Sequence, residues 1–187
     1  MILRPFRRRA ENRTIASLYG MIVAQARSKS FYSDYGVPDT VQGRFDLIVL
    51  HLVLLIRRLT PTESSTPQRG GGQNIGQRLF DAFCRDLDDN LREMAIGDLA
   101  VPKHMRRFGE AFYGRQAAYI AALGAEDQEA FENALARNIF GGDGIESEAG
   151  RLARYARALV RELDVQAEDT LLRGELAFPR PEAFVDA

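Results

Sequence analysis

The stretch DTVQGRFDLIVLHLVLLIRRL, residues 39–59, is the most hydrophobic part of the chain and constrains the fold most strongly. Its longest part without a charged residue, 47–56, is much shorter than the roughly 20 residues that a transmembrane helix needs. On a helix advancing about 100° per residue, its apolar side chains face nearly every direction. In a soluble protein, such a helix is surrounded by other elements. We therefore predict that residues 40–59 form the central helix of a bundle.

The rest of the chain also shows helical periodicity. Apolar residues recur at helical spacing over 13–32, 75–96, 102–123, 126–139 and 146–164, and a short further helix is expected at 168–173. No convincing strand-like alternation occurs in the sequence. These patterns predict one all-α, bundle-like domain of six to seven helices over residues 13–175.

Three segments outside these helices are expected to differ from them. Residues 60–74, TPTESSTPQRGGGQN, have the composition of a loop. Residues 176–187 are expected to form an extended or disordered tail. Residues 1–12 are expected to form a flexible basic arm that contacts an anionic membrane or the ribosome, or is simply solvated. The arginines that would make this contact are Arg4, Arg7, Arg8, Arg9 and Arg13.

Composition excludes several classes of protein. The formal net charge is −1, so no overall field attracts nucleic acid and DNA is not an expected partner. Cys84 is the single cysteine, so a disulfide within the chain is impossible and a reducing compartment is expected. Its apolar neighbours in the sequence favour a packed structural thiol over a nucleophile.

No constellation for catalysis or metal binding is recognisable. His51 and His104 are the only histidines, and neither belongs to a Glu-x-x-His or His-x-x-x-His pattern. The segment GGGQNIGQR lacks the Gly-Lys-Ser/Thr ending of a phosphate-binding loop, and Gly-x-Ser-x-Gly does not occur. We therefore expect no enzymatic activity, no metal and no cofactor.

Three polar residues interrupt the apolar helix at a spacing of seven: Arg44, His51 and Arg58. This spacing places them on one side of the helix. A buried cation must be paired or hydrogen-bonded. One hypothesis pairs this stripe with Asp81 and Asp88 of the following helix, and the other opens part of it onto a groove.

Several motifs occur in an order that resembles the ubiquinol–cytochrome c chaperone family. They are GVPDT, GRFDLIVLH, LREM, GDL and EAFYGR, and the similarity covers roughly residues 15–165 and is densest over 31–119. The resemblance implies a non-enzymatic protein that binds newly made cytochrome b and assists biogenesis of ubiquinol–cytochrome c reductase. It also implies contact with a small accessory protein or the ribosome.

The resemblance also suggests where the protein works and which residues contribute. A chain that starts at Met1 without a transit peptide and uses 23 Arg but 2 Lys fits a bacterial member from a GC-rich genome. We expect it in the bacterial cytoplasm, peripheral at the inner face of the cytoplasmic membrane. The residues expected to form the client-binding surface, or to shape it, are Arg44, His51, Asp81, Asp98, Lys103, Phe112 and Arg115.

Two alternatives belong to other classes. The chain could be a small helical ligand- or metal-binding bundle with His51 and neighbouring carboxylates around an internal pocket. It could also be a ribosome- or nucleic-acid-associated module that acts through the basic arm. The aromatic residues of segment 102–123 favour either core packing or an apolar groove.

Overall fold

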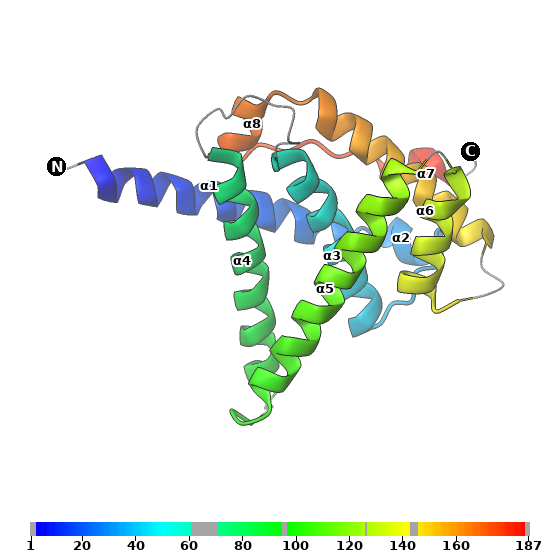
Figure 1. Ribbon diagram of the computed structural model, residues 1–187, viewed down its shortest axis with the longest axis horizontal. Coiled ribbons are helices and arrows are strands. Elements are labelled where there is room, and N and C mark those ends of the chain that lie inside the picture. The colour runs from blue at the N-terminus through cyan, green and yellow to red at the C-terminus, as the bar shows by residue number, and fades with distance from the viewer. Residues whose placement is uncertain (1–2, 61–70, 95–96, 126, 143–145, 186–187) are drawn as a thin grey trace.

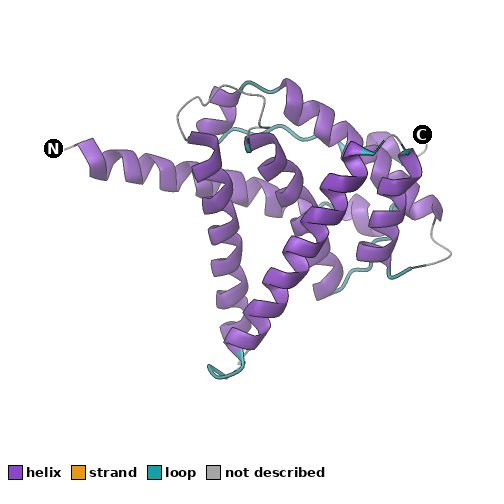
Figure 2. Ribbon diagram, in the orientation of Figure 1, coloured by secondary structure: helices purple, strands orange, loops and turns teal. Residues whose placement is uncertain are grey.

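The computed structural model describes residues 3–60, 71–94, 97–125, 127–142 and 146–185. Every regular element within these ranges is helical, which confirms the all-α prediction (Figure 2). The elements are α1 (Leu3–Ala26), α2 (Lys29–Ser33), α3 (Val41–Leu59), α4 (Gly71–Glu93), α5 (Val101–Gly124), α6 (Gln128–Leu135), the π-helical segment η1 (Ala136–Phe140), α7 (Glu146–Val165), α8 (Glu168–Leu172) and the 3-10 segment η2 (Pro181–Phe184).

Helix α3 lies at the centre of the fold, as its apolar sequence predicts. It packs against α1, α4, α5 and α7, and its apolar side chains are almost all buried. Thr40 is its N-cap, with the Thr40 hydroxyl accepting a hydrogen bond from the Gly43 N–H at 3.1 Å. This bond satisfies one of the N–H groups that a helix start leaves without a partner.

The start of α3 passes very close to the preceding turn at Gly43. A Cβ atom built on Gly43 would overlap the carbonyl oxygen of Pro38. We expect Gly43→Ala to lower the free energy of unfolding by about 1–3 kcal/mol, because backbone must move to admit the methyl group. Urea denaturation measures this change.

Gly109 in α5 provides the matched control for that substitution. A Cβ on Gly109 meets no heavy atom within 4 Å, so Gly109→Ala should stabilise the protein by about 0.5–1 kcal/mol through helix propensity. Equal effects of the two substitutions would show that the turn at Gly43 is not tightly packed.

Helices α4 and α5 form a V that converges at the segment joining them (Figure 1). Pro102 lies in the first turn of α5, as predicted. Helix α4 starts at Gly71, earlier than the predicted residue 75, so the end of the expected loop 60–74 is helical. The rest of that loop, residues 61–70, lies outside the described residues.

The two ends of the described chain differ from the sequence predictions. Helix α1 already begins at Leu3, so most of the expected arm 1–12 is the first part of a helix that projects beyond its neighbours (Figure 1). The predicted helix 13–32 is interrupted after Ala26, and α2 follows as a separate short helix. Periodicity predicted the apolar face of α1 but not its extension through the arginine-rich residues.

The segment 175–185 packs onto the core rather than forming a detached tail. The Tyr35 hydroxyl donates to the Pro181 carbonyl at 2.6 Å, and the Gln25 amide donates to the Pro179 carbonyl at 3.3 Å. Pro181 is buried, and Phe178 packs against the His51 ring with centroids 5.8 Å apart. The C-terminal segment therefore covers the junction of α2, α3 and α7.

Candidate functional site

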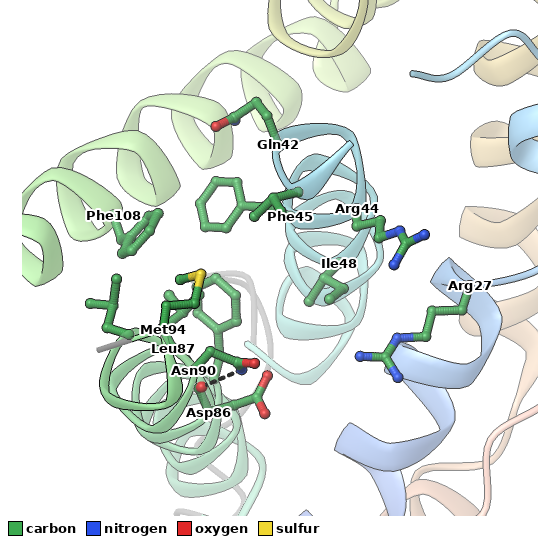
Figure 3. Close-up of a pocket in the computed structure, with 13 residues that line it drawn as sticks. Arg27, Gln42, Arg44, Phe45, Ile48, Asp86, Leu87, Asn90, Met94 and Phe108 are labelled. Carbon is green, nitrogen blue, oxygen red and sulfur yellow. Dashed lines mark hydrogen bonds between the residues drawn. The ribbon is translucent and has the colours of Figure 1, made fainter. Parts of the chain in front are cut away.

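An apolar groove lies where α3 begins, α4 ends and α5 begins. Its cavity measures about 230 Å³, and Figure 3 shows side chains of α3, α4 and α5 converging on it. Its apolar lining is Val41, Phe45, Ile48, Phe83, Leu87, Leu91, Met94 and Phe108. This groove is the candidate functional site.

Aromatic rings that pack at tilted angles form the floor of the groove. The Phe45 ring lies 5.2 Å from that of Phe108 and 5.7 Å from that of Phe83, measured between centroids. Phe45 and Phe83 are buried, so this floor is continuous with the core. Tilted aromatic contacts of this kind add stability beyond the burial of area.

Two large apolar side chains at the groove are open to solvent. Val41 is 76% exposed and Met94 is 55% exposed. Exposed apolar residues that border the same apolar cavity are typical of a binding surface. A flexible methionine also adapts to differently shaped partners.

Polar groups line the other edge of the groove (Figure 3). Arg44 forms an ion pair with Asp39 at 2.7 Å, with both side chains more than half exposed. Asp86 accepts a hydrogen bond from the Tyr19 hydroxyl at 2.8 Å, and burial together with this carboxylate raises the pKa of Tyr19. Arg27 is exposed beside them and forms no ion pair within the described ranges. The groove therefore combines an apolar floor with a charged edge.

A buried ion pair contacts the aromatic floor of the groove from the interior of the protein. The Arg115 guanidinium lies 2.7 Å from the Asp46 carboxylate, and the two side chains are 14% and 2% exposed. Burial raises the pKa of Asp46, whereas Arg115 and the Gln42 amide act in the opposite direction. The same guanidinium lies 5.7 Å from the centre of the Phe45 ring. Arg115, a predicted client-binding residue, thus lies inside the protein and positions Phe45.

The predicted pairing of Arg44, His51 and Arg58 with α4 is wrong. Arg58 instead donates to the carbonyls of Leu163 and Gln166, at 2.8 and 3.0 Å, at the end of α7. Asp81 and Asp88 have partners on their own helix: Asp81 accepts from Gln77, and Asp88 pairs with Arg92. The stripe faces α7 and, at Arg44, solvent, because α4 packs on another side of α3.

His51 is fully enclosed and both its ring nitrogens are engaged. Nδ1 lies 2.7 Å from the Leu47 carbonyl, which only accepts, so Nδ1 carries the proton and Nε2 accepts from the Tyr155 hydroxyl at 2.9 Å. Burial lowers the pKa of His51 to about 4. In this arrangement His51 is a neutral core residue that ties α3 to α7, with neither nitrogen open for a ligand.

The other predicted client-binding residues do not form one surface. Phe112 is 1% exposed and stacks on Phe80 at 4.7 Å. Asp81 and Lys103 are exposed on different helices, and Asp98 is 86% exposed and paired with Arg92 at 2.7 Å. Among the seven predicted residues, Arg44 alone lines the groove.

The described residues contain no group of three or more His, Cys, Asp or Glu side chains arranged to hold a metal ion. No helix in the same ranges combines the length and hydropathy that crossing a bilayer requires.

Of the five N-terminal arginines, Arg9 and Arg13 have exposed side chains one turn apart on α1. Burial raises the pKa of the partly buried Cys84 thiol, as expected for a packed cysteine.

The sequence analysis allowed an apolar groove on segment 102–123, and Phe108 of that segment does line the groove, but it did not predict the contributions of α3 and α4. The apolar stripe of the predicted helix 75–96 includes Leu87, Leu91 and Met94. Leu91 is buried and Leu87 packs against the core, whereas Met94 is 55% exposed. Periodicity alone does not show which part of this stripe another helix covers.

Comparison with known proteins gives two matches. The family model described as "Ubiquinol-cytochrome C chaperone" matches residues 33–178. The crystal structure of a protein described as the Cbp3 homolog from Brucella abortus matches with a TM-score of 0.83 and 34% sequence identity, over 98% of this chain and 99% of that chain. A search of curated proteins gave no match.

Proposed function

The chain belongs to the ubiquinol–cytochrome C chaperone family, and from this membership we propose that it binds newly made cytochrome b during assembly of ubiquinol–cytochrome c reductase. In this role it is a non-enzymatic assembly factor. It protects apolar segments of its client until they reach their partners in the complex.

The open apolar groove is the observation that carries this proposal. Its cavity of about 230 Å³ is smaller than the roughly 300–1,000 Å³ typical of sites for small molecules and cofactors. It suits a few apolar side chains inserted from a segment that lies across Val41 and Met94. Recognition of this kind is common where a helix docks its apolar face into a groove.

The predicted site residues fall into two roles under this proposal. Arg44 lies at the charged edge and contacts polar parts of the client. Arg115, Phe112 and His51 act from inside by holding the helices that form the floor. Asp81, Asp98 and Lys103 are exposed and are candidates for contacts beyond the groove.

The arginines at the start of α1 are proposed as a second contact, with the ribosome or an anionic membrane surface. Arg9 and Arg13 have exposed side chains on α1, whose first part projects beyond its neighbours (Figure 1). Such a contact places the protein peripherally at the inner face of a bacterial cytoplasmic membrane, where a small accessory protein could also join it. Binding through these residues should weaken steeply as salt concentration rises.

Site-specific photocrosslinking tests the groove as the client site. A photoreactive amino acid at Val41 or Met94 should give an adduct with cytochrome b in cells that are synthesising it. Val165, 78% exposed at the end of α7, is the control position and should give none. Equal adducts from Val165, or none from either groove position, would contradict the proposal.

The double substitution Val41→Asp and Met94→Asp should block the groove without unfolding the protein, since both side chains are mostly exposed. Each apolar side chain that the client covers contributes about 1.5–3 kcal/mol, so client affinity should fall at least about tenfold. Cytochrome b and assembled complex, measured by spectroscopy and native gels in a complemented deletion strain, should decrease accordingly. Val165→Asp should leave both at wild-type levels.

A further inference from the structure

The tip joining α4 and α5 presents one leucine completely to solvent. The Ala100 N–H donates to the Gly97 carbonyl at 2.8 Å, closing a tight turn whose outer side carries Leu99. Leu99 is 99% exposed, more than any other large hydrophobic residue in the described ranges. Figure 1 shows that the tip projects away from the other helices, so no described element covers it.

The charged side chains near Leu99 give one side of the tip a positive charge. The acidic neighbour Asp98 is bound by Arg92 at 2.7 Å, which draws its carboxylate toward α4. Lys103 and Arg107, one turn apart, are exposed in the first turns of α5 and form no ion pair within the described residues. The exposed leucine therefore precedes, by four and eight residues in the sequence, two cations that have no ion-pair partner within the described residues.

We propose that this tip inserts Leu99 into the surface of an anionic phospholipid bilayer, with Lys103 and Arg107 on the lipid phosphates. An exposed apolar side chain gains by entering the lipid interface, and each nearby cation strengthens attraction to anionic lipid about fivefold. A single exposed leucine is ordinary on a protein surface. Its place at a projecting apex beside unpaired cations distinguishes this one.

The inserted tip would bring the groove close to the bilayer. Met94, which borders the groove, precedes Leu99 by five residues. The meaning of this approach of the groove to the bilayer rests on the proposed function of the groove. Lipid binding by the tip does not depend on that function. The tip is also separate from the arginines at the start of α1, so the two contacts can be tested independently.

The chain contains no tryptophan, so Leu99→Trp provides a single fluorescent reporter at the apex. With vesicles of phosphatidylcholine and phosphatidylglycerol in equal parts, its emission should shift to shorter wavelength and brominated lipids should quench it. Val165→Trp, also at an exposed apolar position, is the matched control and should show neither effect. Adding Lys103→Gln and Arg107→Gln to Leu99→Trp should weaken vesicle affinity at least about tenfold.

Circular dichroism must first show that each variant is folded. The proposal is then overturned if the Trp emission of Leu99→Trp shifts with no vesicle, shifts equally with phosphatidylcholine alone, or shifts no more than that of Val165→Trp. It is also overturned if vesicle binding depends on Arg9 and Arg13 but not on Lys103 and Arg107. A shift caused by an apolar peptide but not by vesicles would make the tip a protein contact instead. Because the assay contains no client, its failure leaves the crosslinking test of the groove unaffected.

Discussion

Replacing Asp46 with alanine should lower the free energy of unfolding by about 3–5 kcal/mol, because it leaves the Arg115 guanidinium inside the protein without its carboxylate. Asp46 is 2% exposed and Arg115 is 14% exposed, so water cannot readily replace the lost partner. Arg115 also donates to the carbonyls of Ala111 and Asn138, both at 3.3 Å, which holds it in place. Urea denaturation near neutral pH measures the loss.

An exposed ion pair of similar geometry provides the control. Arg106 and Glu110 lie 2.9 Å apart on α5, with both side chains largely exposed. Glu110→Ala should change the free energy of unfolding by less than about 1 kcal/mol. If Asp46→Ala has an equally small effect, the buried pair does not hold α3 to α5. Because Arg115 also faces the Phe45 ring, a larger effect should be accompanied by weaker client binding.

Acidification should destabilise the protein through His51. Burial lowers the pKa of His51 from 6.5 to about 4, so the unfolded chain takes up this proton at a higher pH than the folded protein does. The stabilising contribution is complete above pH 6.5 and is lost as pH falls through 4. The difference in pKa corresponds to about 3 kcal/mol in total, of which about 2 kcal/mol is lost by pH 5.

Comparison with His51→Gln isolates this contribution from that of the carboxylates, which titrate in both proteins. The variant should be less stable at pH 7, since Gln cannot reproduce both hydrogen bonds of the ring. Its free energy of unfolding should then fall less steeply between pH 7 and pH 5 than that of the wild type. Parallel curves for the two proteins would show that His51 takes up a proton in the folded state as readily as in the unfolded state.

Local signals in the sequence were sufficient to predict that the chain is helical and where most of its helices lie, although not every helix boundary. The all-round apolar surface of α3 is a property of neighbouring residues, and the structure confirms that this helix is largely buried. The motif order predicted the family, which the family model and the solved relative confirm. These inferences required no knowledge of which helix packs against which.

Contacts between distant segments could not be predicted in the same way. The seven-residue spacing of His51 and Arg58 places them on one face of α3, but it does not specify that α7 covers that face. Phe178 and Pro181 lie in a segment without periodicity, so nothing local indicates that they are covered. The groove lies where the start of α3 meets the end of α4 and the start of α5, and an apolar stripe looks the same whether or not a partner helix covers it.

The docked C-terminal segment determines when the protein can complete its own fold. Thr14 and Ser17 of α1 donate to the carbonyls of Leu172 and Gly174, and Tyr35 donates to that of Pro181. Because the chain is synthesised from its N-terminus, these early residues lack their partners until residues 172–181 have been added. During translation, α1 and α2 therefore lack part of their final covering until this C-terminal segment has been added. A factor that assists another protein's assembly thus depends on its own C-terminal segment, and a chain that stops before Pro181 would lack the contact with Tyr35.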